Sequence, residues 1–439
     1  MLAALRSFLG PGTVSAARLS ALGAASKALG LIRELLLAWA FGTSAVVDAF
    51  RLGLTYTTYF SHLFFGEAMT GVLVPMLARL RGTGDEHLEA SRLKAGVTVA
   101  ALVLTLPVSV GFLLVPDVVV GLLAPGLAPE TRASTIAFLR IFGLAIPLYA
   151  LSSVAVMVRQ AAGNFAPLGL RPAGQNLFFI GGVVVAAVLR QPILIPAAFA
   201  VYYALVLAAL DRGDLLASLS VGARAAASGL RLVAMRWFPL AAGLMLFRSN
   251  ALVERYFGSG LPTGSIASLD YARTVTDLPM LVLAVPAGAV LLTNLSRARE
   301  LGLPWNVRRK LALVVALAIV WSVCVVLLAE PMTVLVFQRG AFDVASVMAT
   351  SNAVRGLGAG AWALVLSHLM TQYLMATAPP WALILPAGVS LATNIILASM
   401  LVPSFGLVGL GLSSSGAALA FGMSAIIGAR MRGLRRRQA

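Results

Sequence analysis

Residues 95–115 read AGVTVAALVLTLPVSVGFLLV, a run of 21 residues without a charged side chain. Lys94 comes directly before the run, and Asp117 follows soon after it. An α-helix of about 20 apolar residues crosses the hydrocarbon core of a bilayer. This stretch therefore predicts a transmembrane helix.

The same apolar character extends over the whole chain of 439 residues. Hydrophobic residues make up 60% of it and charged residues only 11%, and the mean hydropathy is +0.94. Soluble proteins carry about 25% charged residues, so the composition excludes a water-soluble protein with one buried core. The single cysteine, Cys324, lies inside an apolar run, which excludes an internal disulfide and a CxxC metal or redox site.

Apolar runs of spanning length, bounded by charges or by Gly and Pro, predict about 12 transmembrane helices. Their approximate ranges are 14–41, 46–78, 95–115, 132–158, 172–189, 192–210, 237–257, 265–297, 309–329, 345–377, 380–402 and 405–429. The predicted fold class is an all-α polytopic membrane protein. Several ranges are longer than a bilayer requires, so we expect tilted or kinked helices among them.

The net charge of +17 follows the predicted topology and does not indicate a nucleic-acid partner. With a cytoplasmic N-terminus, the inner segments hold 21 basic residues. The outer segments then hold only Arg132, Arg190, Arg255 and Arg339. Cytoplasmic loops of membrane proteins are enriched in Lys and Arg, so both termini are expected in the cytoplasm.

Three motifs of the first half return in the second half in the same order, at nearly constant offsets of 222, 215 and 214 residues. They are DAFR at 48–51 and DYAR at 270–273, LRIFG at 139–143 and VRGLG at 354–358, and PAG at 172–174 and 386–388. This pattern predicts two pseudo-symmetric six-helix lobes in parallel orientation. The predicted organisation is a lobe at 1–210, a cytoplasmic connection at 211–236, a second lobe at 237–429 and a basic tail at 430–439.

Charged residues inside predicted spans are costly and by default mark a substrate or ion path. The candidate substrate-binding residues are Lys27, Arg33, Asp48, Arg51, Arg140, Arg248, Asp270, Arg273 and Arg355. Basic residues outnumber acidic ones among them, and arginine pairs bidentately with phosphate, so the cargo is expected to be anionic.

Four of the candidates, each on an even-numbered span, are predicted to form a basic ring in the outer third of the membrane: Arg51, Arg140, Arg273 and Arg355. Lys27, Arg33 and Arg248 are expected at deeper levels. Each arginine near a helix end has an alternative role, in which its side chain extends to the membrane interface and binds nothing.

Other chemistries find little support in the sequence. Asp48 and Asp270 have a second interpretation as proton or sodium sites. His62 and His368 fit packed, hydrogen-bonded residues better than metal ligands, because no further ligand lies at suitable spacing. No phosphate-binding loop and no Ser-His-Asp arrangement is present. We therefore expect no enzyme, no metal and no cofactor.

Several passages resemble the MurJ/MviN branch of the MOP flippase superfamily, over nearly the whole chain. They are SKALGLIRE at 26–34, DAF at 48–50, LFFGEA at 63–68, LAPG at 123–126 and FQRGAFD at 337–343, of which the last is the most specific. The sequence departs from that family at Ser61 and His62, where two arginines are common.

The resemblance implies two lobes around a central cavity that opens alternately to either side of the membrane. It implies a flippase for lipid II, the undecaprenyl-diphosphate-linked peptidoglycan precursor, in the bacterial cytoplasmic membrane. Lys27, Arg33 and Asp48 occupy family positions. The implied partners are an anionic lipid-linked substrate and membrane lipids, with transport driven by H+, by Na+ or by the membrane potential.

Two alternatives of the same architecture remain. One is an exporter of another polyprenyl-linked glycan, and the other is a cation-coupled drug antiporter. An antiporter of organic cations favours a cavity of net negative charge, whereas the charges predicted here are mostly positive.

Overall fold

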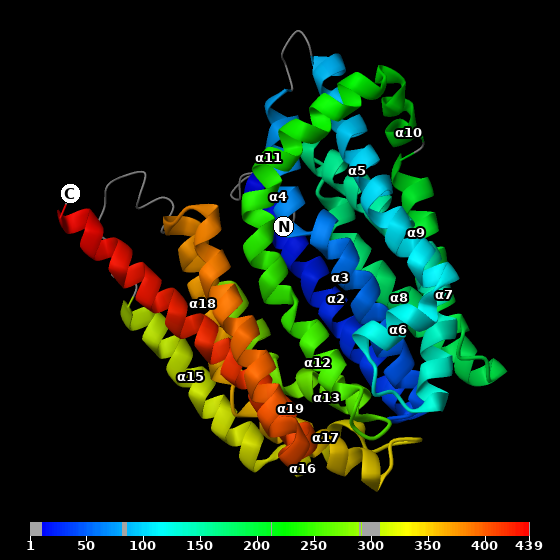
Figure 1. The fold of residues 1–439 in the computed structure, drawn as a ribbon, viewed down its shortest axis with the longest axis vertical. Helices are drawn as coiled ribbons and strands as arrows, with labels where there is room; N and C mark the ends of the chain where they lie inside the picture. Colours follow the sequence, from blue (N-terminus) through cyan, green and yellow to red (C-terminus); the bar gives the residue numbers. More distant parts are fainter. Residues whose placement is uncertain (1–10, 81–85, 212, 289–290, 292–307, 439) are drawn as a thin grey trace, which may run out of the picture. The chain divides into compact units, whose positions relative to one another are not determined.

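The computed structural model describes residues 11–438 except 81–85, 212, 289–290 and 292–307, and all regular structure in these ranges is helical (Figure 1). The first half contains α2 (Pro11–Phe41), α3 (Ala45–Phe65), α4 (Glu67–Arg79), α5 (Glu86–Leu114), α6 (Pro116–Leu123), α7 (Pro129–Ala161), α8 (Ala166–Leu189), α9 (Leu194–Asp211), α10 (Asp214–Ser218), η1 (Leu219–Val221) and α11 (Ala223–Arg248). The second half contains α12 (Asn250–Gly258), α13 (Ser265–Thr276), η2 (Met280–Ala284), α15 (Arg308–Leu327), α16 (Ala329–Phe337), α17 (Val344–Gly358), α18 (Ala361–Thr377), η3 (Pro380–Leu383) and α19 (Ile384–Gln438).

Each predicted span overlaps one of these helices, and the all-α polytopic fold is confirmed. Within the described ranges, six helices are long and apolar enough to cross a membrane, or nine when three bent pairs are counted as single spans. The helix α2 is not among these six, although it is 31 residues long. It carries Lys27, Arg33 and Glu34 within eight residues, which lowers its hydropathy.

Long predicted spans are interrupted, as their length suggests. The range 46–78 is divided between α3 and α4 by Gly66, whose ψ of −149° is not helical. The helices α17 and α18 meet at an angle of 48°. The range 132–158 differs, because α7 runs through it without a break.

The helix α19 is a hairpin of two antiparallel arms. Gly406 interrupts it with φ of 52° and ψ of −126°, three residues after Pro403. The hydroxyl of Ser390 in the first arm donates to the carbonyl of Ala417 in the second at 2.9 Å. The two arms therefore correspond to the separate spans predicted at 380–402 and 405–429.

Contacts divide the chain into two compact units that differ slightly from the predicted halves. Unit 1 comprises Met1–Ala40, Tyr56–Val119 and Thr135–Phe238. Unit 2 comprises Phe41–Thr55, Val120–Ser134 and Pro239–Ala439. Two short segments of the first half thus belong to the unit that holds the second half.

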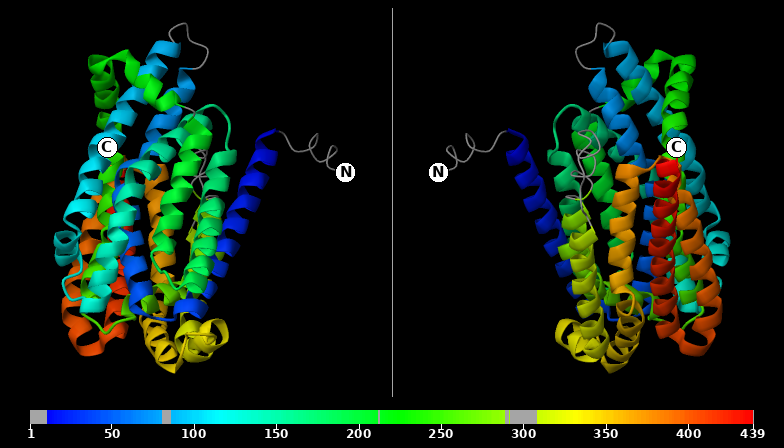
Figure 2. Two further views of the ribbon diagram at one scale, coloured as in Figure 1. Left: turned by 90° about the vertical axis from the view of Figure 1, so that its right-hand side faces the viewer. Right: turned by 90° about the vertical axis from the view of Figure 1, so that its left-hand side faces the viewer.

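Unit 1 has a core of aliphatic side chains from α4, α5 and α7, to which Leu73, Val97 and Val154 contribute without any exposed surface. The helices α8 and α9 run side by side and cover another part of this unit (Figures 1 and 2). Between them and α7 lies a cluster of aromatic rings, in which Phe199 and Tyr203 are 4.7 Å apart.

Unit 2 is built on close contacts of α17 and α18 with α19 (Figure 2). Asp343 begins α17 by accepting a hydrogen bond from the backbone of Ser346, which holds the pKa of this exposed carboxyl below its usual range. Further along, Gly356 of α17 faces Gly411 of α19. A Cβ on Gly356 would lie 2.5 Å from the carbonyl oxygen of Val408, so the small residues bring the two backbones together, as is common in membrane helices.

Replacing Gly356→Ala is therefore expected to destabilise the protein, because the added methyl group meets backbone that cannot move away. Overpacking of this kind costs about 1–3 kcal/mol. The control is Gly388→Ala in α19, where no atom lies within 4 Å of the added Cβ. Thermal unfolding of the purified variants should show a lower midpoint for the first variant alone, and equal midpoints would contradict this packing.

Candidate functional site

The carboxylate of Asp48 caps the N-terminus of α13. Its two oxygens accept hydrogen bonds from the backbone N–H groups of Gly264 at 2.6 Å and Ala267 at 2.7 Å. The first N–H groups of a helix have no partner inside the helix and carry partial positive charge. Asp48 is only 2% exposed, so a buried negative charge is matched here by a helix end from the other half of the sequence.

Gly264 makes this cap sterically feasible. Its φ is +91°, a left-handed conformation that glycine adopts without strain. A Cβ at this position would lie 2.1 Å from the carbonyl oxygen of Thr43. The segment that carries Asp48 therefore approaches the start of α13 as closely as two backbones can.

Two further contacts join the segment 41–55 to the second half of the chain. The hydroxyls of Thr43 and Ser346 are 2.8 Å apart, and the hydroxyl of Tyr271 donates to the carbonyl of Gly42 at 3.1 Å. These contacts and the cap explain why this segment belongs to unit 2.

One turn after Asp48, Arg51 enters an ion-pair cluster. Asp270 receives two hydrogen bonds from one nitrogen of Arg255, at 2.7 and 2.8 Å, and lies 3.5 Å from Arg51. Arg255 also donates to the hydroxyl of Thr55 at 3.1 Å. Arg51 and Arg255 are 5% and 6% exposed, so one carboxylate is placed between two buried guanidinium groups.

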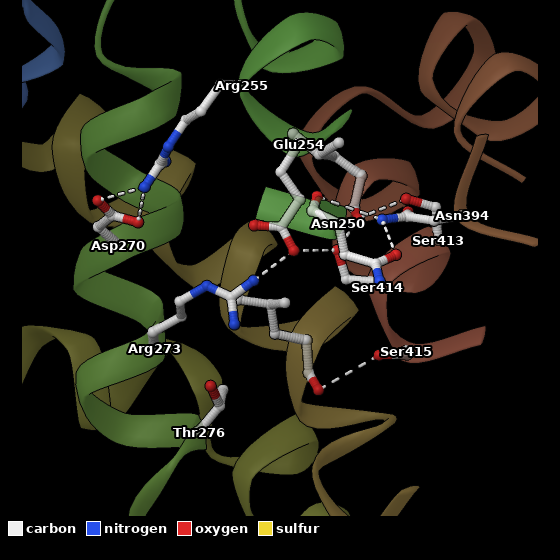
Figure 3. A network of polar contacts seen from close by, with 12 residues as sticks. Asn250, Glu254, Arg255, Asp270, Arg273, Thr276, Asn394, Ser413, Ser414 and Ser415 are labelled. Atoms are coloured by element: carbon white, nitrogen blue, oxygen red, sulfur yellow. Dashed lines mark hydrogen bonds and ion pairs between the residues drawn. The ribbon is translucent and has the colours of Figure 1, made fainter. Parts of the chain in front are cut away.

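A second cluster adjoins the first through the neighbouring residues Glu254 and Arg255 (Figure 3). Arg273 donates to Glu254 at 2.5 Å, and the hydroxyl of Ser414 donates to the same carboxylate oxygen at 2.8 Å. The two clusters together connect α3, α12, α13 and α19.

In unit 1, Arg33 is the centre of a smaller polar group. Its guanidinium donates to Glu34 at 2.5 Å and to the side-chain oxygen of Asn176 at 3.0 Å, and it lies 5.6 Å from the ring of Phe179. Lys27, the other basic candidate on α2, is exposed. Of the two basic candidates in the first predicted span, Arg33 thus has fixed partners and Lys27 lies on the surface.

The other candidates are more scattered. Arg140 is exposed on α7 in unit 1. Arg248 is half-buried at the end of α11. Arg355 is exposed, donates to Asn352 at 2.9 Å and lies 3.7 Å from Glu330. The described contacts join Arg51 to Asp270, but they do not join Arg140 or Arg355 to these clusters, so a ring of four stays a prediction.

The sequence pattern does not single out three of the residues found here. Arg255 is predicted only as an outer topology charge, and Glu254 has no predicted role, although a Glu-Arg pair at the end of an apolar run is a recognisable signal. Arg171 is one of the 21 basic residues predicted on the inner side. It lies in unit 1 against the rings of Tyr149 and Tyr203, at 4.3 and 4.9 Å.

Metal chemistry has no assembled ligand set in the part of the chain that the structure describes, since no three His, Cys, Asp or Glu side chains come together there. His62 shares a hydrogen bond of 3.0 Å with the hydroxyl of Tyr149, as a packed histidine would. The arrangement is therefore one of fixed charges that can bind ions or charged groups.

Comparisons with known proteins agree on one family. The family model described as "Lipid II flippase MurJ" matches residues 37–434. A probable lipid II flippase MurJ of Rhizobium meliloti is 26% identical and covers 88% of this chain and 74% of its own length. The lipid II flippase MurJ of Burkholderia cenocepacia is 24% identical over 93% of this chain and 82% of its own length.

Solved structures show the same fold. A lipid II flippase MurJ in an inward closed conformation superposes with a TM-score of 0.82 at 20% identity, over 94% of this chain and 87% of that one. An inward-facing multidrug resistance MATE transporter of the MOP superfamily gives 0.74 at 12% identity, over 94% and 96%. At these identities the likeness is one of fold.

The contact between the segment 41–55 and α17 is testable by cross-linking. In a Cys324→Ala background, Thr43→Cys with Ser346→Cys should form a disulfide under mild oxidation, because the two hydroxyls are 2.8 Å apart. Thr43→Cys with Asn352→Cys is the control, since residue 352 lies about 9 Å further along α17. Gel mobility after proteolysis between the two positions reports the bond, and equal yields for both pairs would disprove this proximity.

Proposed function

The chain belongs to the lipid II flippase MurJ family, and we propose that it moves lipid II across the membrane by holding the diphosphate on its buried basic residues. It is a multi-pass membrane transporter and not an enzyme, and its substrate is lipid-linked. Its membrane is the bacterial cytoplasmic membrane, as for its relatives.

The observation that carries this proposal is the set of arginines buried in membrane helices with partners already arranged. Arg51 and Arg255 share Asp270, and Arg33 is held by Glu34 and Asn176. A guanidinium that is oriented before the substrate arrives loses little freedom on binding, and its planar fork matches two phosphate oxygens. The carboxylates keep these charges neutralised when no lipid is bound.

The roles of the individual residues follow from their surroundings. We assign the deeper contact with the diphosphate to Lys27, Arg33 and Arg248, and the outer contact to Arg51 and Arg273, with Arg140 and Arg355 as further members of the predicted ring. Asp48 and Asp270 are assigned to holding the helices in place. The half-exposed side chain of Arg273, at 30%, supports its part in binding.

The segment 41–55 is assigned to closing the outer side. It carries Asp48, Thr43 and Gly42, which together contact α13 and α17. The distribution of basic residues supports a cytoplasmic position for both termini. In this orientation the cap of α13 by Asp48 closes the external opening and must be released before lipid II can leave.

The test of the function is depletion of the protein in its native host. Lipid II should accumulate in the cytoplasmic leaflet, because the step that brings it to the outer leaflet is lost. Accessibility of lipid II to an added external enzyme measures this distribution. Unchanged lipid II together with increased sensitivity to cationic drugs would favour the antiporter alternative.

The role of the buried arginines is testable in proteoliposomes with headgroup-labelled lipid II. Arg33→Gln and Arg51→Gln should reduce transport about tenfold or more per folded molecule, as expected for loss of a charge-assisted hydrogen bond. Arg33→Lys should retain part of the activity, because it keeps the charge and loses the fork. The control is Arg339→Gln, which changes an exposed arginine of the outer segment. Normal transport by both Arg33→Gln and Arg51→Gln would exclude Arg33 and Arg51 from binding.

The closing role of 41–55 predicts the effect of the disulfide between positions 43 and 346. Oxidised Thr43→Cys/Ser346→Cys protein should stop transporting lipid II, since Asp48 cannot leave α13, and a reductant should restore transport. The single variant Thr43→Cys, treated in the same way, controls for the oxidation. Transport that continues at full cross-linking would show that this contact persists throughout the cycle.

A further inference from the structure

Unit 2 contains a small pocket with a partly polar lining beside the second ion-pair cluster. Its volume is about 30 Å³, room for one or two water molecules. Its polar lining comes from Arg273, Thr276, Asp277, Ser414 and Ser415, and the rest of the wall is apolar. Nothing in the proposed binding of the diphosphate uses Asp277.

Asp277 lies where α13 is interrupted. It follows the last residue of α13, its own φ of −87° and ψ of 2° are not helical, and the π-helical turn η2 begins at Met280. The hydroxyl of Thr276 donates to it at 3.3 Å, and within the described ranges this is the single hydrogen bond to its carboxylate. A membrane helix broken beside a half-buried carboxylate is a common setting for an ion site.

Arg273 is paired with one carboxylate and lines a pocket with another. It lies four residues before Asp277, which places both side chains on one face of the helix. Its guanidinium donates to Glu254 and lines the same pocket as Asp277. One positive charge is therefore close to two carboxylates, of which only Glu254 binds it directly.

Of the charges nearest to this pair, Arg51 and Arg255 carry two positive ones, and Asp48 and Asp270 carry two negative ones. Asp270, one turn earlier on α13, is paired with Arg255 and Arg51. The pocket wall contributed by α17, α18 and α19 consists of uncharged residues: Leu357, Gly360, Ala361, Leu364, Ser414, Ser415 and Ala418.

The nearest other titratable or charged groups of α17 and α18 face elsewhere. Arg355 of α17 is exposed beside Glu330. The ring of His368 of α18 lies against Gly288, 2.9 Å from the position of a Cβ there. Glu254, Arg273 and Asp277 thus form a unit with one negative charge in excess.

We propose that Glu254 and Asp277 together bind one proton, and that this proton decides whether Arg273 is free to bind the diphosphate of the substrate. Two carboxylates that share one site in a medium of low dielectric constant do not both stay ionised easily. The proton comes from water in the pocket, adds to a carboxylate oxygen and returns to water when it is released. No other bond is formed or broken.

A proton fits this pocket better than a sodium ion. The guanidinium of Arg273 is part of the wall and would repel a metal cation placed in the pocket. A proton removes the excess charge on the carboxylate itself and needs no shell of ligands. When both carboxylates are ionised, two negative charges attract Arg273, and when the pair holds a proton, only one negative charge does.

This inference rests on the proposed function, and it makes substrate and proton binding reciprocal. The diphosphate competes with the carboxylates for Arg273, so binding of lipid II favours the protonated pair and takes up a proton. Acidic conditions favour the same state and should strengthen binding. Raising the pH should weaken binding, because the ionised pair withdraws Arg273.

The experiment measures the affinity of the full chain in nanodiscs for lipid II between pH 5.5 and 8.5. Both phosphates of lipid II are substituted and keep their charge across this range. For the unaltered protein, the affinity should fall about tenfold from the acidic to the alkaline end. A pH indicator in weak buffer should record proton uptake when lipid II is added.

Three variants isolate the pair. Asp277→Asn imitates the protonated state and should bind lipid II equally well at every pH, without proton uptake. Asp277→Glu keeps a titratable group and should retain the pH dependence. Glu130→Gln removes an exposed carboxylate of the same unit and should behave as the unaltered protein.

The outcomes separate this inference from the proposed function. Absence of lipid II binding at all pH values would overturn both. Normal binding that does not depend on pH, or the same pH dependence in Asp277→Asn, would overturn the proton site alone. An affinity that follows the Na+ concentration at constant pH would also overturn it, in favour of a metal cation.

Discussion

A charged side chain inside a membrane helix must be neutralised within the protein, because the surrounding lipid offers no partner. This constraint organises unit 2. Asp48 is matched by the N-terminal amides of α13, and Asp270 is matched by Arg255 and Arg51. Breaking such a buried pair on one side costs several kcal/mol, so these contacts determine which helices lie together.

The same contacts explain why part of the first half belongs to the second unit. The segment 41–55 has few residues, but it provides Asp48, which caps the start of α13, and Arg51, which pairs with Asp270 of α13. These contacts between charged groups are strong while the segment is closed. When it opens, water or substrate replaces the lost partners. A transporter needs this property, because its closed state must be specific and still reversible.

In this molecule, charged residues lie where the helices are interrupted. Asp277 ends α13, and Asp48 caps its other end through Gly264. A continuous helix satisfies all of its backbone groups and leaves none for ligands. The short helix α13 is instead bounded by a carboxylate at each end, and it carries Asp270 and Arg273 between them, which makes it the element best suited to respond to substrate.

The sequence by itself determined the all-helical membrane fold and the approximate place of each span, because apolar length is a local property that a bilayer selects directly. It also singled out Arg51 and Asp270 as candidate site residues, since any charge in such a run is conspicuous. Only the tertiary structure decided the partners: that Arg51 pairs with Asp270 from the other half, and that Arg273 pairs with Glu254. Ion pairing depends on distances between atoms of different helices, and these distances are not encoded in the spacing of either segment alone.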